Sequence, residues 1–160
     1  MTWQIEGLDE EKLAEVRSSG RDHGGNAVEA FVDQDGGWPV RCCLRDSKAG
    51  DELAIVAWNP FPWSGPYAEV GPVVIHANGC ADRHLGDRVP DQFRGRAQIL
   101  RPYGHDRRIA YDRIRHLGPD DDLDAAIADL MANPDVSFLQ ARNVLSGCYS
   151  FTATSTRPAG

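Results

Sequence analysis

The apolar run from Leu53 to Trp58 is the feature of this sequence that most restricts its fold. Side chains of a strand alternate between the two faces of a sheet, so an uninterrupted apolar run indicates a central strand covered on both faces. Four prolines and two glycines follow between Asn59 and Pro72. Because proline has no N–H to donate to a neighbouring strand, this stretch is predicted to be an ordered loop outside the sheet.

Alternating or β-branched segments indicate further strands. They are expected at residues 2–7, 27–32, 73–76, 136–141 and 148–154. Residues 97–103 and 108–111 flank a polar turn and are predicted to form a hairpin.

Two helices are predicted from their caps and apolar stripes. Asp9 can accept backbone N–H groups at the start of a helix over residues 10–18, which Gly20 ends. The acidic residues 120–122 introduce the second helix. Its apolar side chains follow the three-and-four spacing of a buried stripe, namely Leu123, Ala126, Ile127, Leu130 and Met131. The pattern favours an α+β fold, with a mainly antiparallel sheet, two principal helices and long ordered loops, over repeated βαβ winding.

Length and composition indicate one globular domain. The chain has 160 residues, and we expect residues 1–154 to form the domain and residues 155–160 to form a flexible tail. Its formal charge of −7 disfavours nucleic acid as a partner. It has no apolar run of membrane-spanning length and only four cysteines, so we predict a cytoplasmic protein with reduced thiols and no membrane partner.

Three blocks of the sequence resemble a known family. They are residues 37–46 (Gly-Trp-Pro-Val-Arg-Cys-Cys-Leu-Arg-Asp), residues 65–76 (Gly-Pro-Tyr-Ala-Glu-Val-Gly-Pro-Val-Val-Ile-His) and residues 141–149 (Ala-Arg-Asn-Val-Leu-Ser-Gly-Cys-Tyr). In order and spacing they resemble the bacterial domain-of-unknown-function family numbered 1203. The first block of that family usually has the pattern Pro-Cys-Arg-x-Cys-Leu, whereas this chain has Val40 at the first cysteine and Cys42 at the variable place. The resemblance implies no reaction, but it directs attention to these segments.

Cysteine and histidine side chains in these blocks allow two kinds of chemistry. Cys43 and His76 are a candidate nucleophile and base, because a neighbouring imidazole favours the reactive thiolate. The alternative is a buried apolar cysteine and a hydrogen-bonded histidine. Cys43, His76, Cys80 and Cys148 also carry suitable donor atoms for tetrahedral zinc, although a paired Cys-x-x-Cys knuckle is missing. We therefore predict no cofactor, with zinc as the alternative.

A pocket of polar side chains is the preferred functional hypothesis. Its predicted members are Arg41, Tyr67, Glu69, His76, Arg142 and Asn143. Arginine offers a fixed fork for a carboxylate or phosphate, and Glu69 and His76 can exchange protons. In the competing structural interpretation, Arg41 pairs with Glu69, Tyr67 packs beneath the proline-rich loop and Asn143 caps a turn.

Residues 94–115 are locally basic, with seven arginines against two aspartates. This segment can attract an anionic ligand or, in a homo-oligomer, the acidic residues 120–124 of another subunit. The favoured interpretation is a solvated hairpin face.

These features lead to one functional hypothesis and two alternatives. The chain is predicted to be a small, cofactor-independent enzyme that uses acid–base chemistry on a small anionic or carbonyl-containing metabolite, as an isomerase, cyclase, lyase or hydrolase. Glu69 and His76 would move protons, Arg41 would anchor the substrate, and Tyr67, Arg142 and Asn143 would orient it or stabilise charge. The alternatives are a noncatalytic metabolite-binding or protein-binding module and a zinc-stabilised structural domain.

Overall fold

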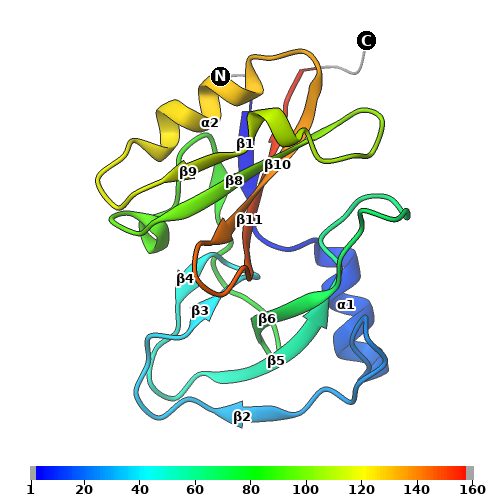
Figure 1. Cartoon of the computed structure of the whole chain (residues 1–160). Coiled ribbons are helices and arrows are strands. Elements are labelled where there is room, and N and C mark those ends of the chain that lie inside the picture. Colours follow the sequence, from blue (N-terminus) through cyan, green and yellow to red (C-terminus); the bar gives the residue numbers. More distant parts are fainter. Residues whose placement is uncertain (1–2, 158–160) are drawn as a thin grey trace.

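The structure, a computed structural model, describes residues 3–157 and contains two sheets, each with a helix against it (Figure 1). The first sheet has the order β7-β1-β11-β10-β8-β9. Its strands are β1 (Trp3–Glu6), β7 (Leu85–Gly86), β8 (Gln98–Gly104), β9 (Arg115–Leu117), β10 (Val136–Asn143) and β11 (Tyr149–Ser155). The second sheet has the order β2-β5-β6-β3-β4. Its strands are β2 (Ala30–Val32), β3 (Pro39–Val40), β4 (Arg45–Asp46), β5 (Glu52–Trp58) and β6 (Gly71–His76).

The described strands pair antiparallel except for β3, which runs parallel to β6. Two α-helices, α1 (Glu10–Ser19) and α2 (Leu123–Met131), and two short 3₁₀ helices, η1 (Asp91–Phe93) and η2 (Tyr111–Arg113), complete the described elements. The predicted α+β class with a mainly antiparallel sheet is therefore confirmed.

Both helices begin at the caps that the sequence indicates. The Asp9 carboxylate accepts the Lys12 N–H, and Gly20 ends α1 in the left-handed conformation. Leu13 and Val16 of α1 pack into the core of the second sheet. Asp122 caps α2, whose buried stripe packs against the first sheet.

An aromatic cluster fills the space under the proline-rich loop. Phe61 packs edge-on against Tyr103 of β8, while Tyr103 stacks on Phe138 of β10 at 4.9 Å between ring centroids. Trp63 packs against the same group. The loop therefore runs across the face of the first sheet as an ordered segment.

Strand β5 differs from its prediction in one respect. It lies inside the second sheet, and Leu53, Ala54, Val56 and Trp58 are buried, but Ile55 is 52% exposed. One face of this strand is therefore open toward its middle, although the sequence predicted cover on both faces.

The predicted hairpin of residues 97–103 and 108–111 forms only next to its turn, where Gly104 donates its N–H to the Arg108 carbonyl. The second segment makes an isolated bridge from Ile109 to Tyr103, and Ala110 donates its N–H to Pro102. Pro102 has no N–H to return, so the ladder stops there. The chain then turns through η2, and β9 becomes the partner of β8.

The predicted C-terminal tail is described only in part. Ser155 is the last residue of β11, and the Arg157 guanidinium donates to the Met131 carbonyl. Residues 158–160 lie outside the described range.

A candidate site of three cysteines and a histidine

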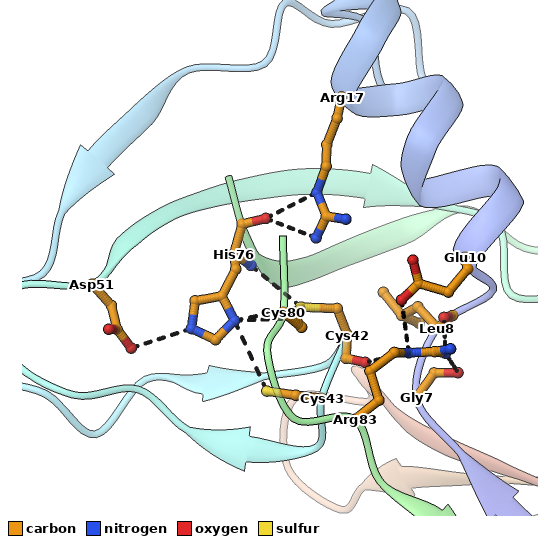
Figure 2. The surroundings of a disulfide bond; sticks show 10 residues. All are labelled: Gly7, Leu8, Glu10, Arg17, Cys42, Cys43, Asp51, His76, Cys80 and Arg83. Carbon is orange, nitrogen blue, oxygen red and sulfur yellow. Dashed lines mark hydrogen bonds and ion pairs between the residues drawn. A yellow bond between two sulfur atoms is a disulfide. The ribbon is translucent and has the colours of Figure 1, made fainter. Parts of the chain in front are cut away.

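Four side chains with metal-ligand chemistry converge beside the second sheet (Figure 2). Cys42 and Cys43 lie in the turn between β3 and β4, His76 is the last residue of β6, and Cys80 lies in the following loop. The three sulfur atoms and one imidazole nitrogen lie within 4.8 Å of one another. Cys42 and Cys43 are buried, and His76 and Cys80 are half-buried.

Pairing of β3 with β6 brings the turn and the histidine together. Val40 lies opposite Val74 in the parallel pair, and Arg41 donates its N–H to the Val74 carbonyl at 2.8 Å. The next residues then turn across the end of β6, where His76 lies. Leu44 closes this turn with φ of 58°, a conformation that is uncommon for residues other than glycine and often occurs at functional sites.

The loop that carries Cys80 is held by Arg83 (Figure 2). The Arg83 guanidinium donates to the backbone carbonyls of Gly7, Leu8 and Cys42 and pairs with Glu10 at 2.9 Å. These contacts tie the loop to the start of α1 and to the cysteine turn. The position of Cys80 therefore depends on contacts with two distant parts of the chain.

The two ring nitrogens of His76 have different environments. Nδ1 lies 3.1 Å from the sulfur of Cys80, 3.7 Å from that of Cys42 and 3.9 Å from that of Cys43. Nε2 lies 3.2 Å from Oδ2 of Asp51. With the proton on Nε2, the imidazole donates to this carboxylate and directs the lone pair of Nδ1 toward the sulfurs.

Asp51 is itself fixed in place. Its carboxylate accepts the backbone N–H of Lys48 at 2.9 Å, and this hydrogen bond together with the one from His76 lowers the pKa of Asp51. The backbone of His76 is held as well, because its N–H points at the Cys42 sulfur and its carbonyl accepts from Arg17. The imidazole is thus oriented before any ligand arrives.

The oxidation state of the cysteines differs from the prediction of reduced thiols. Cys42 and Cys80 form a disulfide, with their Cα atoms 6.7 Å apart, while Cys43 and Cys148 are free. Burial raises the pKa of the Cys43 thiol. Since 38 residues separate the two bonded cysteines, their proximity depends on the tertiary fold.

The set of candidate zinc ligands also changes. The structure groups Cys43, His76 and Cys80 with Cys42, whereas Cys148 lies outside this cluster, just before β11. Sequence reasoning missed Cys42 as a member of this cluster and Asp51 as the hydrogen-bond partner of His76. The adjacent cysteine pair was a signal for Cys42, but Asp51 had none.

Arg41 lies in the interior of the protein. It is 8% exposed, its Nη1 donates to Oε1 of Gln92 at 2.7 Å and its Nε donates to the Tyr149 carbonyl at 3.1 Å. The guanidinium also lies 5.0 Å from the centre of the Phe93 ring. Burial lowers the pKa of Arg41 to about 10. The alternative pairing of Arg41 with Glu69 is absent from these contacts. They connect the residue after β3 to η1 and to the start of β11.

Glu69 and Arg142 form an ion pair near the start of β6. Glu69 pairs with Arg101 at 2.9 Å and with Arg142 at 3.6 Å. Glu69 and Arg142 line a cavity of about 200 Å³. His76 is at the opposite end of β6, whose length of six residues separates its two ends by roughly 17 Å. The two predicted proton carriers therefore lie in different places.

The remaining predicted pocket residues serve local contacts. The Asn143 side chain accepts the N–H groups of Leu145 and Ser146, which caps the turn between β10 and β11. Tyr67 packs at the edge of the aromatic cluster and beside Tyr111. Both contacts match the structural interpretation of these two residues.

Acidic neighbours partly neutralise the basic segment at residues 94–115. Arg94 pairs with Asp91 and Asp124, and Arg115 pairs with Asp129. Arg101 and Arg113 also have carboxylate partners. This segment is therefore not a continuous basic surface.

The fold and the site define the class of this protein: a two-sheet α+β protein with a cluster of three cysteines and one histidine. The chain belongs to the family described as Protein of unknown function (DUF1203), which matches residues 37–154. The match includes all four residues of the cluster. No curated protein and no solved structure matches the chain. Across residues 3–157, no helix has the length and apolar character needed to cross a membrane.

Proposed function

We propose that this protein is a zinc-binding domain whose ligands are Cys42, Cys43, His76 and Cys80. The observation that carries this proposal is the convergence of three sulfurs and one imidazole nitrogen within 4.8 Å. Thiolate and imidazole are the donors that zinc prefers, and three cysteines with one histidine are a common tetrahedral set. Asp51 supports the proposal, because metal-bound histidines usually donate their other N–H to a carboxylate or carbonyl group.

The proposed zinc has a structural role. With four protein ligands the coordination shell is closed, whereas catalytic zinc keeps a position for water or substrate. The metal would join the turn after β3, the end of β6 and the loop at Cys80. Since such contacts are absent from the unfolded chain, the free energy of metal binding adds to the stability of the fold.

Zinc binding and the disulfide exclude each other. The Cys42–Cys80 bond uses two of the three sulfurs in the cluster, and zinc needs them as separate thiolates. The metal is therefore expected to bind the reduced chain only.

Metal analysis of the reduced protein tests this proposal. Protein produced with zinc and purified with a reductant is expected to contain about one zinc per chain. Replacing Cys43 by serine removes one ligand and is expected to weaken zinc binding by at least about 100-fold, whereas outer-shell changes cost 10–100-fold. Cys148→Ser is the matched control, since it removes the other free thiol. Reduced protein without stoichiometric metal, or equal zinc affinity in both variants, would reject the proposal.

A thiol–disulfide redox function is the second candidate, and the disulfide itself favours it. Reduction of the Cys42–Cys80 bond takes up two electrons and two protons and yields two thiols. The free Cys43 thiol lies in the same cluster as this bond. A metal-free protein with a reversible two-electron couple in the range of cellular thiol buffers would favour this function over zinc binding.

The acid–base enzyme predicted from the sequence remains a further proposal, with fewer residues in its proposed site. Because Glu69 and His76 lie at opposite ends of β6, they would not act on one small substrate together. An enzyme of this kind would use Glu69 together with Arg101 and Arg142, which both pair with the Glu69 carboxylate. Loss of turnover in Glu69→Gln but not in His76→Ala is the expected pattern.

A further inference from the structure

A broad depression beside the cysteine turn differs in charge from the rest of the protein. It has a volume of about 600 Å³ and lies between the β4 region and the segment that leads into η1. It is lined by Leu44, Arg45, Asp46, Lys48, His84, Arg88, Val89, Pro90, Asp91, Gln92 and Arg94. The volume falls within the range of roughly 300–1,000 Å³ that is usual for small-ligand sites.

Positive charge dominates this depression. Four lysine or arginine side chains line it together with two aspartates, so its formal charge is +2, although the whole chain carries −7. Both aspartates already have partners, because Asp46 accepts from Gln92 and Asp91 pairs with Arg94. A concave surface of one sign concentrates its field and attracts ligands of the opposite charge.

Three of the cations form no ion pair with a carboxylate among the described residues, although the charge of Lys48 acts on Asp51 outside the depression. They are Arg45 at the start of β4, Lys48 in the turn after it, and Arg88 on the facing wall. Arg94, in contrast, is held by Asp91 and Asp124. The three unpaired cations therefore come from both walls and remain available to a ligand.

The walls themselves are well fixed. Gln92 is 8% exposed and joins Arg41 on one side to Asp46 on the other. The Val89 N–H donates to Asp124, and His84 contacts the Arg88 carbonyl through Nε2 at 3.1 Å. Because the backbone that carries the cations is held in place, a ligand would lose less free energy in ordering the site.

We infer that this depression binds a small phosphorylated ligand with two or more negative charges. Arginine matches phosphate oxygens with its planar fork of donors, and lysine adds a point charge. Arg45 and Lys48 would hold the ligand from one wall and Arg88 from the other. None of the proposed zinc ligands lines this depression, although Leu44 and Arg45 directly follow Cys43.

Calorimetric titration of the full chain with pyrophosphate tests this inference. Wild-type protein is expected to bind pyrophosphate at low ionic strength and to bind it more weakly at about 150 mM salt. Lys48→Gln combined with Arg88→Gln is expected to weaken binding by at least about tenfold, because each lost cation removes charge-assisted hydrogen bonds. Arg45→Gln provides a second variant on the same wall as Lys48.

The matched control is Arg21→Gln combined with Arg108→Gln, which removes the same charge at exposed positions outside the depression. Retention of wild-type affinity within about twofold is expected for this control, since distant surface charges are screened. Three results would overturn the inference: no binding by wild-type protein, unchanged affinity in both variants of the depression, or an equal loss in the control.

Discussion

Replacing Arg41 by methionine tests whether this residue serves the fold. Two opposing effects set the expected change. Burial lowers the pKa of Arg41 well below its usual range, to about 10, so the buried charge costs roughly 3 kcal/mol. The methionine variant recovers this cost.

The variant also loses the partners of the guanidinium. The Gln92 side-chain oxygen and the Tyr149 carbonyl would each be left without this donor, at about 1–3 kcal/mol for a buried acceptor. The contact with the Phe93 ring adds about 1 kcal/mol. The losses exceed the gain, and the expected net destabilisation is about 2 kcal/mol.

Urea unfolding followed by tryptophan fluorescence measures this difference. Arg41→Met combined with Gln92→Leu is expected to be less destabilised than Arg41→Met, because one orphaned acceptor is removed with its donor. Arg108→Met, at an exposed position, is the control and should change stability by no more than about 0.5 kcal/mol. An Arg41→Met protein as stable as the wild type would refute this reasoning and return Arg41 to the candidate ligand-binding residues.

Three further outcomes are expected. Asp51→Asn should lower zinc affinity by about 10–100-fold in a chelator competition, because the carboxylate orients His76; unchanged affinity would contradict the proposed support of the ligand. Hydrogen bonds from the Ser47 hydroxyl and from backbone N–H groups lower the pKa of Asp33. This carboxylate therefore stabilises the fold above a pH of about 4, and the stabilisation is lost as the pH falls further. Asp33→Asn should show a smaller loss of unfolding free energy on acidification, and an identical pH profile would contradict this. Ile127→Ala, in the fully buried stripe of α2, should cost about 2–5 kcal/mol in urea unfolding, whereas the half-exposed Ile55→Ala should cost clearly less, and equal losses would contradict the assigned packing.

Some residues of the site could be predicted from the sequence. His76 and Cys80 have the short spacing of two ligands, and Cys43 was a candidate thiol. Asn143 was correctly given a turn cap as one of its two interpretations. These features depend on residue type and on neighbours close in sequence. Whether Cys42 or Cys148 joins the other three residues of the cluster depends instead on which loops meet, and residues close in sequence do not decide that.

By itself the sequence determined the local structure and the class of fold. Caps at Asp9 and Asp122, the apolar stripe of α2 and the run that forms β5 act over a few residues, so their physical causes are visible in the sequence. Only the tertiary structure decided which reactive side chains come together. Parallel pairing of β3 with β6 places the vicinal cysteines at the end of β6 that carries His76, whereas Glu69 precedes the other end. Such pairing is set by the packing of the whole core, which is why it separated the two predicted proton carriers and brought together a cluster that the sequence showed only in part.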